Sequence, residues 1–267
     1  MPNFDTPQPI TAVVEIAAGS IRLVASDRDD TVAEVRPRDE SRPHDVKAAE
    51  QARVDFTNGT LAVTSKRGFA FPRRGAVIVD ISLPEGSRLD VSVSSAHVRA
   101  DGRYCECKLA SASGDFSVAS VAGNIKVDTA SGAVTVDVVK GAAAICTASG
   151  DATIGDLDGD VKFRAASGSL TIMRLQGNVN AQTASGEVTV ATAVNGSVSA
   201  QTSSGEVVVG IAEGTAAQLD LRTWSGDVRN SLTPSDGPAE GDQTLVVHAR
   251  TGSGDVAVQR ATAEAMS

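Results

Sequence analysis

The densest group of chemically active side chains is a short basic and aromatic segment, residues 66–75, which reads Lys-Arg-Gly-Phe-Ala-Phe-Pro-Arg-Arg-Gly. Cations beside exposed aromatic rings bind anionic lipid headgroups or acidic protein surfaces. The segment therefore predicts a contact with a protein partner or an anionic membrane through Lys66, Arg67, Phe69, Phe71, Arg73 and Arg74. In the alternative interpretation, the two phenylalanines cover one end of a hydrophobic core while the cations stay in water.

Catalytic chemistry has little support in the sequence. The histidines, His44, His97 and His248, lie in unrelated contexts without the spacing of metal ligands. Serines are abundant, but none lies in the Gly-x-Ser-x-Gly sequence of a nucleophile elbow. We therefore predict no catalytic residue and no enzymatic activity.

Metal binding is also disfavoured. Acidic residues follow several glycines at a regular interval, as in calcium-binding β-rolls, but Ala133 and Ser169 interrupt this column. Calcium needs six to eight oxygen ligands, more than one carboxylate per turn supplies. Cys105 and Cys107 would point to opposite faces of a strand, and Cys146 is remote in sequence. The sequence predicts no metal and no cofactor.

A repeat of 18 residues organises the second half of the chain. Ser-Gly pairs recur at this interval, and a further glycine falls nine residues after most of them. Glycine accepts the positive φ of a tight turn, and the serine hydroxyl can bond to nearby backbone. We therefore predict structural turns at Ser113, Gly114, Ser131, Gly132, Ser149, Gly150, Ser167, Gly168, Ser185, Gly186, Ser204 and Gly205.

Apolar residues alternate with polar ones within each repeat, for example at Leu170 and Ile172 around Thr171. A period of two indicates strands with one buried face, and equivalent strands of successive repeats would stack in parallel. The pattern predicts a mostly β protein, a parallel two-sheet β-solenoid with about 18 residues per rung in two nine-residue halves.

The remaining segments complete a domain prediction. Residues 1–94 read as a β-rich N-terminal cap with one short helix near 45–53, where helix formers lack breakers. Residues 95–260 form the repeats, with a Pro- and Gly-rich loop insertion at 232–243. Residues 261–267 are expected to fray.

Charge and hydropathy restrict partners and location. The chain has 24 basic and 33 acidic residues, which disfavours nucleic acid as a partner. Its N-terminus lacks the pattern of a signal peptide, and no apolar run is long enough to span a membrane. We expect a cytoplasmic location.

Two sequence features carry a family resemblance. Residues 81–87, Ile-Ser-Leu-Pro-Glu-Gly-Ser, precede reiterated Thr-Ala-Ser-Gly motifs, and this order resembles the bacterial putative-adhesin or toastrack family. The opening Phe-Asp-Thr-Pro at 4–7 and the segments 214–217 and 228–232 resemble its stand-alone cytoplasmic actinobacterial members. The resemblance implies a β-repeat scaffold, in some members linked to envelope stress.

Together these observations predict a non-catalytic scaffold or protein-interaction module that is associated with envelope-stress or membrane-linked assemblies. The expected partners are other proteins, further copies of the chain, or an anionic membrane. Two alternatives stay open: a ligand-binding or hydrolytic site near residues 232–243, and a self-associating structural protein.

Overall fold

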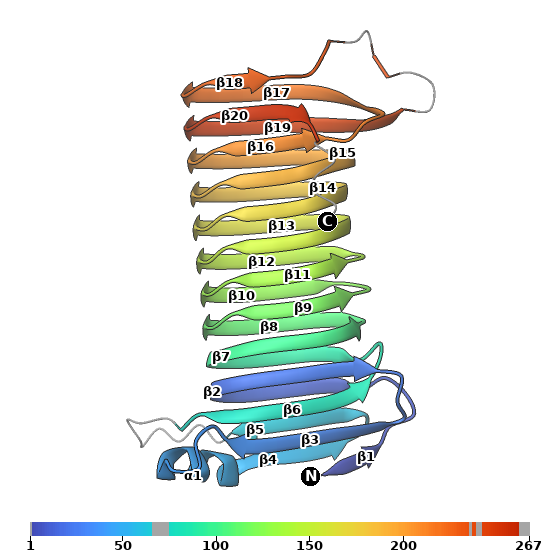
Figure 1. Cartoon of the computed structure of the whole chain (residues 1–267), viewed down its shortest axis with the longest axis vertical. Helices are drawn as coiled ribbons and strands as arrows, with labels where there is room; N and C mark the ends of the chain where they lie inside the picture. The colour runs from blue at the N-terminus through green and yellow to red at the C-terminus, as the bar shows by residue number, and fades with distance from the viewer. Residues whose placement is uncertain (1, 66–74, 235–236, 239–241, 262–267) are drawn as a thin grey trace. The chain divides into compact units, whose positions relative to one another are not determined.

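The computed structural model describes residues 2–65, 75–234, 237–238 and 242–261 (Figure 1). These residues are mostly β-strand, which confirms the predicted class. The chain divides into two compact units, Met1–Thr135 and Val136–Ser267, with β11 (Val134–Val139) at the division. The six residues predicted as a partner or membrane contact, at positions 66–74, lie outside the described residues.

The first unit has the only helix among the described residues, α1 (Pro43–Gln51). Its strands are β1 (Asn3–Asp5), β2 (Thr11–Ser26), β3 (Asp30–Pro37), β4 (Ala52–Thr57), β5 (Thr60–Ser65), β6 (Val77–Pro84), β7 (Arg88–Tyr104), β8 (Glu106–Ser113), β9 (Phe116–Val121) and β10 (Ile125–Ser131).

The helix lies two residues earlier than the predicted 45–53. Pro43 occupies the first helical turn, where its fixed φ is favourable and its missing N–H costs nothing. At the other end, Ala52 and Arg53 leave the helix and pair with Ser65 and Thr64 as the start of β4. Strand pairing thus overrides the helix propensity of these two residues.

The N-terminal segment takes part in the parallel stacking. Strand β2 pairs in parallel with β7, from Thr11 opposite Arg88 to Val24 opposite Asp101. It also pairs in parallel with β5 and β6. A segment from the start of the chain therefore lies between strands that follow it much later in the sequence.

The second unit contains strands that pair only in parallel wherever their register is defined. They are β12 (Ala142–Ser149), β13 (Ala152–Ser167), β14 (Leu170–Ser185), β15 (Val188–Ser204), β16 (Val207–Ile211), β17 (Thr215–Ser225), β18 (Val228–Asn230), β19 (Gln243–Ser253) and β20 (Val256–Arg260). Partners in β13 and β14 are 18 residues apart, for example Val161 and Val179.

The order of the last strands departs from the order of the chain. Strand β19 pairs with β15 on one side and with β17 on the other, and β20 lies likewise between β16 and β18. The segment 243–260 is therefore inserted into the stack, and the outermost strands of this unit are β17 and β18 (Figure 1). Residues 231–242 connect β18 to β19, and Gln243, the last residue of the predicted insertion at 232–243, already belongs to β19.

The core follows from the alternation of side chains. The inward positions of neighbouring strands, such as Phe163 and Ala181, are fully buried, whereas Lys162 and Arg164 on either side of Phe163 are exposed. Burial of these aliphatic columns supplies the main stabilisation, roughly 25 cal/mol per Å² of apolar surface.

The predicted division into two nine-residue halves is not observed in β13, β14 and β15. Each of these strands runs through its middle glycine, and Gly177 adopts a φ of +132° inside β14. Because Gly177 pairs directly with Gly159, the two backbones lie too close for a side chain. The glycine column therefore permits close stacking without ending the strand.

The Ser-Gly corners have the same explanation. Gly186 has a φ of +159°, but Gly168 has no positive φ, so the conformation is not common to the column. What these positions share is contact with the preceding rung: a Cβ at Gly168 would lie 2.3 Å from the carbonyl oxygen of Gly150. Serine adds bonds between rungs, such as the 3.3 Å contact between the Oγ atoms of Ser204 and Ser253.

Candidate functional site

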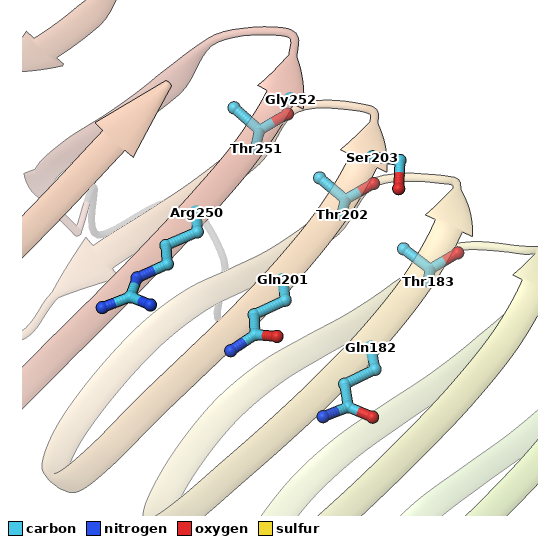
Figure 2. Close-up of a pocket in the computed structure, with 8 residues that line it drawn as sticks. All are labelled: Gln182, Thr183, Gln201, Thr202, Ser203, Arg250, Thr251 and Gly252. Carbon is cyan, nitrogen blue, oxygen red and sulfur yellow. The ribbon is translucent and has the colours of Figure 1, made fainter. Parts of the chain in front are cut away.

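A polar groove lies on the outer face of the second unit. Figure 2 shows its lining residues on β14, β15 and β19, and its volume is about 510 Å³. The lining consists of hydroxyl, amide and guanidinium side chains with one glycine: Gln182, Thr183, Gln201, Thr202, Ser203, Arg250, Thr251 and Gly252.

Strand register aligns these side chains in columns. Gln182 lies opposite Gln201, and Gln201 lies opposite Arg250. Parallel strands are about 4.8 Å apart, so equivalent side chains form a ladder at that spacing. All three side chains are exposed, and they point from the face in the same direction (Figure 2). The ladder therefore offers a row of amide and guanidinium groups to a partner.

The threonine column beside this ladder serves the fold. The hydroxyl of Thr202 donates to the carbonyl oxygen of Gly186 at 3.3 Å, and that of Thr251 donates to Gly205 at 3.1 Å. These threonines are only 7 % exposed. They connect neighbouring rungs, which leaves the glutamines and Arg250 as the accessible groups.

A charge cluster borders the groove on the outermost strand. Asp220 accepts a hydrogen bond from Arg222 Nε at 3.0 Å, and its carboxylate lies 3.6 Å from both Arg250 and His248. The bond from Arg222 and the charges of both arginines lower the pKa of Asp220. The cluster is exposed, so solvent weakens these ion pairs.

A second hollow of about 510 Å³ lies on another face of the same unit. Its charged lining combines Lys140 and Arg174 with Asp156 and Asp158. Charges of both signs alternate over short distances, so this surface lacks the single strong potential that would select one small ion.

The three cysteines differ in their exposure to solvent. Cys107 is buried, whereas Cys105 and Cys146 are exposed. Burial raises the pKa of Cys107 to about 12, which makes its thiol unreactive near neutral pH. Among the described residues no group of three or more His, Cys, Asp or Glu side chains could hold a metal ion.

Two of the histidines have carboxylate neighbours. His97 Nδ1 lies 3.2 Å from Asp115, which is its counterpart 18 residues later, and His248 joins the Asp220 cluster.

No helix in the described ranges is long and apolar enough to cross a membrane.

Sequence reasoning missed the groove. The alignment of Gln182 with Gln201 was readable from the Thr-x-Ser-Gly motifs that follow them. Placing Arg250 beside Gln201 requires the insertion of β19 into the stack, which the repeat spacing does not reveal.

Most of the chain matches a known protein family. The model of the toastrack family, Toastrack DUF4097, matches residues 13–261. The chain belongs to the toastrack family. This confirms the resemblance drawn from the repeated Thr-Ala-Ser-Gly motifs.

Two solved structures similar to this toastrack chain come from Bacteroides fragilis and Parabacteroides distasonis. A putative adhesin from Bacteroides fragilis is 12% identical over 96% of this chain and 95% of its own, with a TM-score of 0.45. A putative lipid binding protein from Parabacteroides distasonis is also 12% identical, over 98% and 96%, with a TM-score of 0.45. No curated protein matches the chain.

Proposed function

We propose that this toastrack protein is a non-catalytic scaffold that binds protein partners through the outer faces of its stacked strands, in the cytoplasm. The observation that carries the proposal is the ladder of Gln182, Gln201 and Arg250 over a groove of about 510 Å³. Exposed amides and a guanidinium in register can donate and accept hydrogen bonds along an extended polypeptide.

A two-sheet β-solenoid is the architecture we infer for the repeats. Support comes from the parallel register of 18 residues and from buried columns on either side of the middle glycine, such as Ile172 and Val179 around Gly177. A solenoid presents flat outer faces supported by a close-packed core, so contact residues are held in fixed positions.

The resemblance to toastrack members linked to envelope stress supports a proposal for the setting of this scaffold. We propose that this scaffold serves an envelope-stress or membrane-associated assembly, and that the segment 66–74 makes an additional contact with anionic lipid. The sequence of that segment, with four cations around two phenylalanines, supports the lipid contact. A ligand-binding or hydrolytic site near 232–243 remains the alternative.

The test compares two lysine pairs on the same two strands. Gln182→Lys with Gln201→Lys changes the groove, while Thr171→Lys with Thr189→Lys adds the same charge to another outward column of β14 and β15. Full-length proteins are used for quantitative affinity purification from extracts of the source cells. We expect the groove pair to lose at least one protein that the wild type and the control pair retain.

The outcome against the proposal is also defined. If the two pairs and the wild type capture the same proteins in the same amounts, the groove is not the binding surface. Circular dichroism of both pairs checks that the strands remain folded.

A further inference from the structure

The outermost rung of the second unit has an unpaired edge. Among the described residues, β17 pairs with β19 and β18 pairs with β20, and Figure 1 draws no described strand beyond them. An edge of this kind presents backbone N–H and C=O groups that can accept another strand.

The outermost rung, formed by β17 and β18, has apolar side chains at positions that are buried in the interior rungs. Val228 occupies the position of Val256, yet Val228 is 45% exposed and Val256 is 0% exposed. Leu219 and Leu221 are half-buried, whereas their partners in β19 are fully buried. Apolar residues at three core positions thus lack the neighbour that buries them in every rung between β13 and β19.

One large aromatic side chain stands on the same edge strand. Trp224, the only tryptophan of the chain, is 93% exposed. An exposed side chain of this size is characteristic of a contact surface, because tryptophan contributes strongly to protein interfaces once it is buried.

The polar residues of β17 are complementary to the same strand in reverse. When two copies of β17 pair antiparallel with Leu221 opposite Leu221, Asp220 of one copy lies opposite Arg222 of the other, twice. Gln218 then lies opposite Trp224, which gives the exposed indole a surface to cover. All four of these side chains point outward, because they alternate with Leu219, Leu221 and Thr223.

We propose that a second copy of this chain adds to the β17–β18 edge, with β17 pairing antiparallel to β17 about Leu221. The contact is isologous, so the dimer closes on a two-fold axis and leaves neither β17 edge open. In a single copy Arg222 bonds to Asp220 of its own strand, and solvent weakens this exposed ion pair. Replacing it by the same ion pair between two copies therefore costs little free energy. The inference rests on the proposed scaffold function and specifies one of its partners.

Charge reversal tests the pairing. Sedimentation velocity of the full-length protein over a concentration series should show a dimer of the 27.2 kDa chain. Asp220→Arg places two arginines opposite each other at both ends of the pair and should weaken dimerisation about tenfold or more. Asp220→Arg with Arg222→Asp restores opposite charges and should return the dimer to within about threefold of wild type.

Controls separate a specific edge from general adhesion. Val228→Glu should also weaken the dimer, because it places a carboxylate in the apolar contact. Asp160→Arg makes the same charge change as Asp220→Arg at an exposed position of β13 that is paired on both sides, and should leave the dimer unchanged. Circular dichroism verifies folding of every variant.

Several results would overturn the proposal. These are a wild type that stays monomeric at about 100 µM, a double variant that dimerises as weakly as Asp220→Arg, or an equal loss with Asp160→Arg. The groove variants Gln182→Lys and Gln201→Lys should dimerise normally. A monomer that still captures partners through the groove therefore refutes the dimer alone, and a dimer without groove-dependent capture refutes the proposed function alone.

Discussion

Replacing Gly177 by alanine should destabilise the second unit far more than the same change at Gly214. Both glycines have positive φ, +132° and +73°, so each variant places a side chain in a sparsely populated backbone region at a cost of about 1–3 kcal/mol. They differ in their surroundings. A Cβ at Gly177 would lie 2.0 Å from the carbonyl oxygen of Gly159, whereas a Cβ at Gly214 would meet nothing within 4 Å.

The clash sets the size of the difference. Relief requires the paired backbones of β13 and β14 to separate by roughly 1 Å or more, and overpacking of this kind costs about 1–3 kcal/mol. We expect the free energy of unfolding to fall by about 3 kcal/mol for Gly177→Ala and by about 1 kcal/mol for Gly214→Ala.

Urea denaturation followed by far-ultraviolet circular dichroism measures both changes. Fluorescence is less suitable, because the single tryptophan, Trp224, is already 93% exposed in the folded protein. Comparison of midpoints at unchanged slope gives the difference in stability. Equal destabilisation by the two variants would refute the argument that stacked backbones, rather than φ alone, require glycine at position 177.

Four further predictions concern the core, the cysteine thiols and the basic segment. Phe163→Ala, at a fully buried position, should lower the free energy of unfolding by about 3–5 kcal/mol in the same urea assay, and a loss below about 1 kcal/mol would contradict its place in the core. A thiol reagent at about pH 8 should label Cys105 and Cys146 but not Cys107 until denaturant is added; prompt labelling of all three would argue against the burial of Cys107. Because burial raises the pKa of Cys107 from 9.0 to about 12, stability present below pH 9 should fall as the pH rises towards 12, and Cys107→Ala should flatten this fall in alkaline denaturation curves. Flotation with anionic liposomes should show salt-sensitive binding that is lost when Lys66, Arg67, Arg73 and Arg74 are changed to serine; equal flotation of both proteins, or none, would leave the segment without a lipid contact.

The sequence predicted those features that depend on local periodicity. Alternation at Leu170, Thr171 and Ile172 specified strands with a buried and an exposed side, and the structure places the first and third in the core. Spacing of the Ser-Gly pairs specified the 18-residue register seen between β13 and β14. These properties are readable because a strand's period of two and a repeat's fixed length are written directly into the chain.

The helix was located only approximately. Its existence follows from the run of helix formers after Pro43, but its end depends on Ala52 and Arg53 joining β4. Pairing partners distant in sequence thus decided a boundary that local propensity could not.

Strand order near both ends was decided by the tertiary structure alone. Strand β2 lies between β7 and the pair β5 and β6, and β19 lies between β15 and β17. Every rung offers the same backbone edge and similar aliphatic columns, so the repeat pattern does not state which rung is next to which. That order brings Arg250 beside Gln201 in the groove and leaves β17 outermost. The sequence by itself determined the strands and their register, whereas the order of stacking determined the candidate surfaces. The reason is that these surfaces are formed by side chains from strands that are far apart in the sequence.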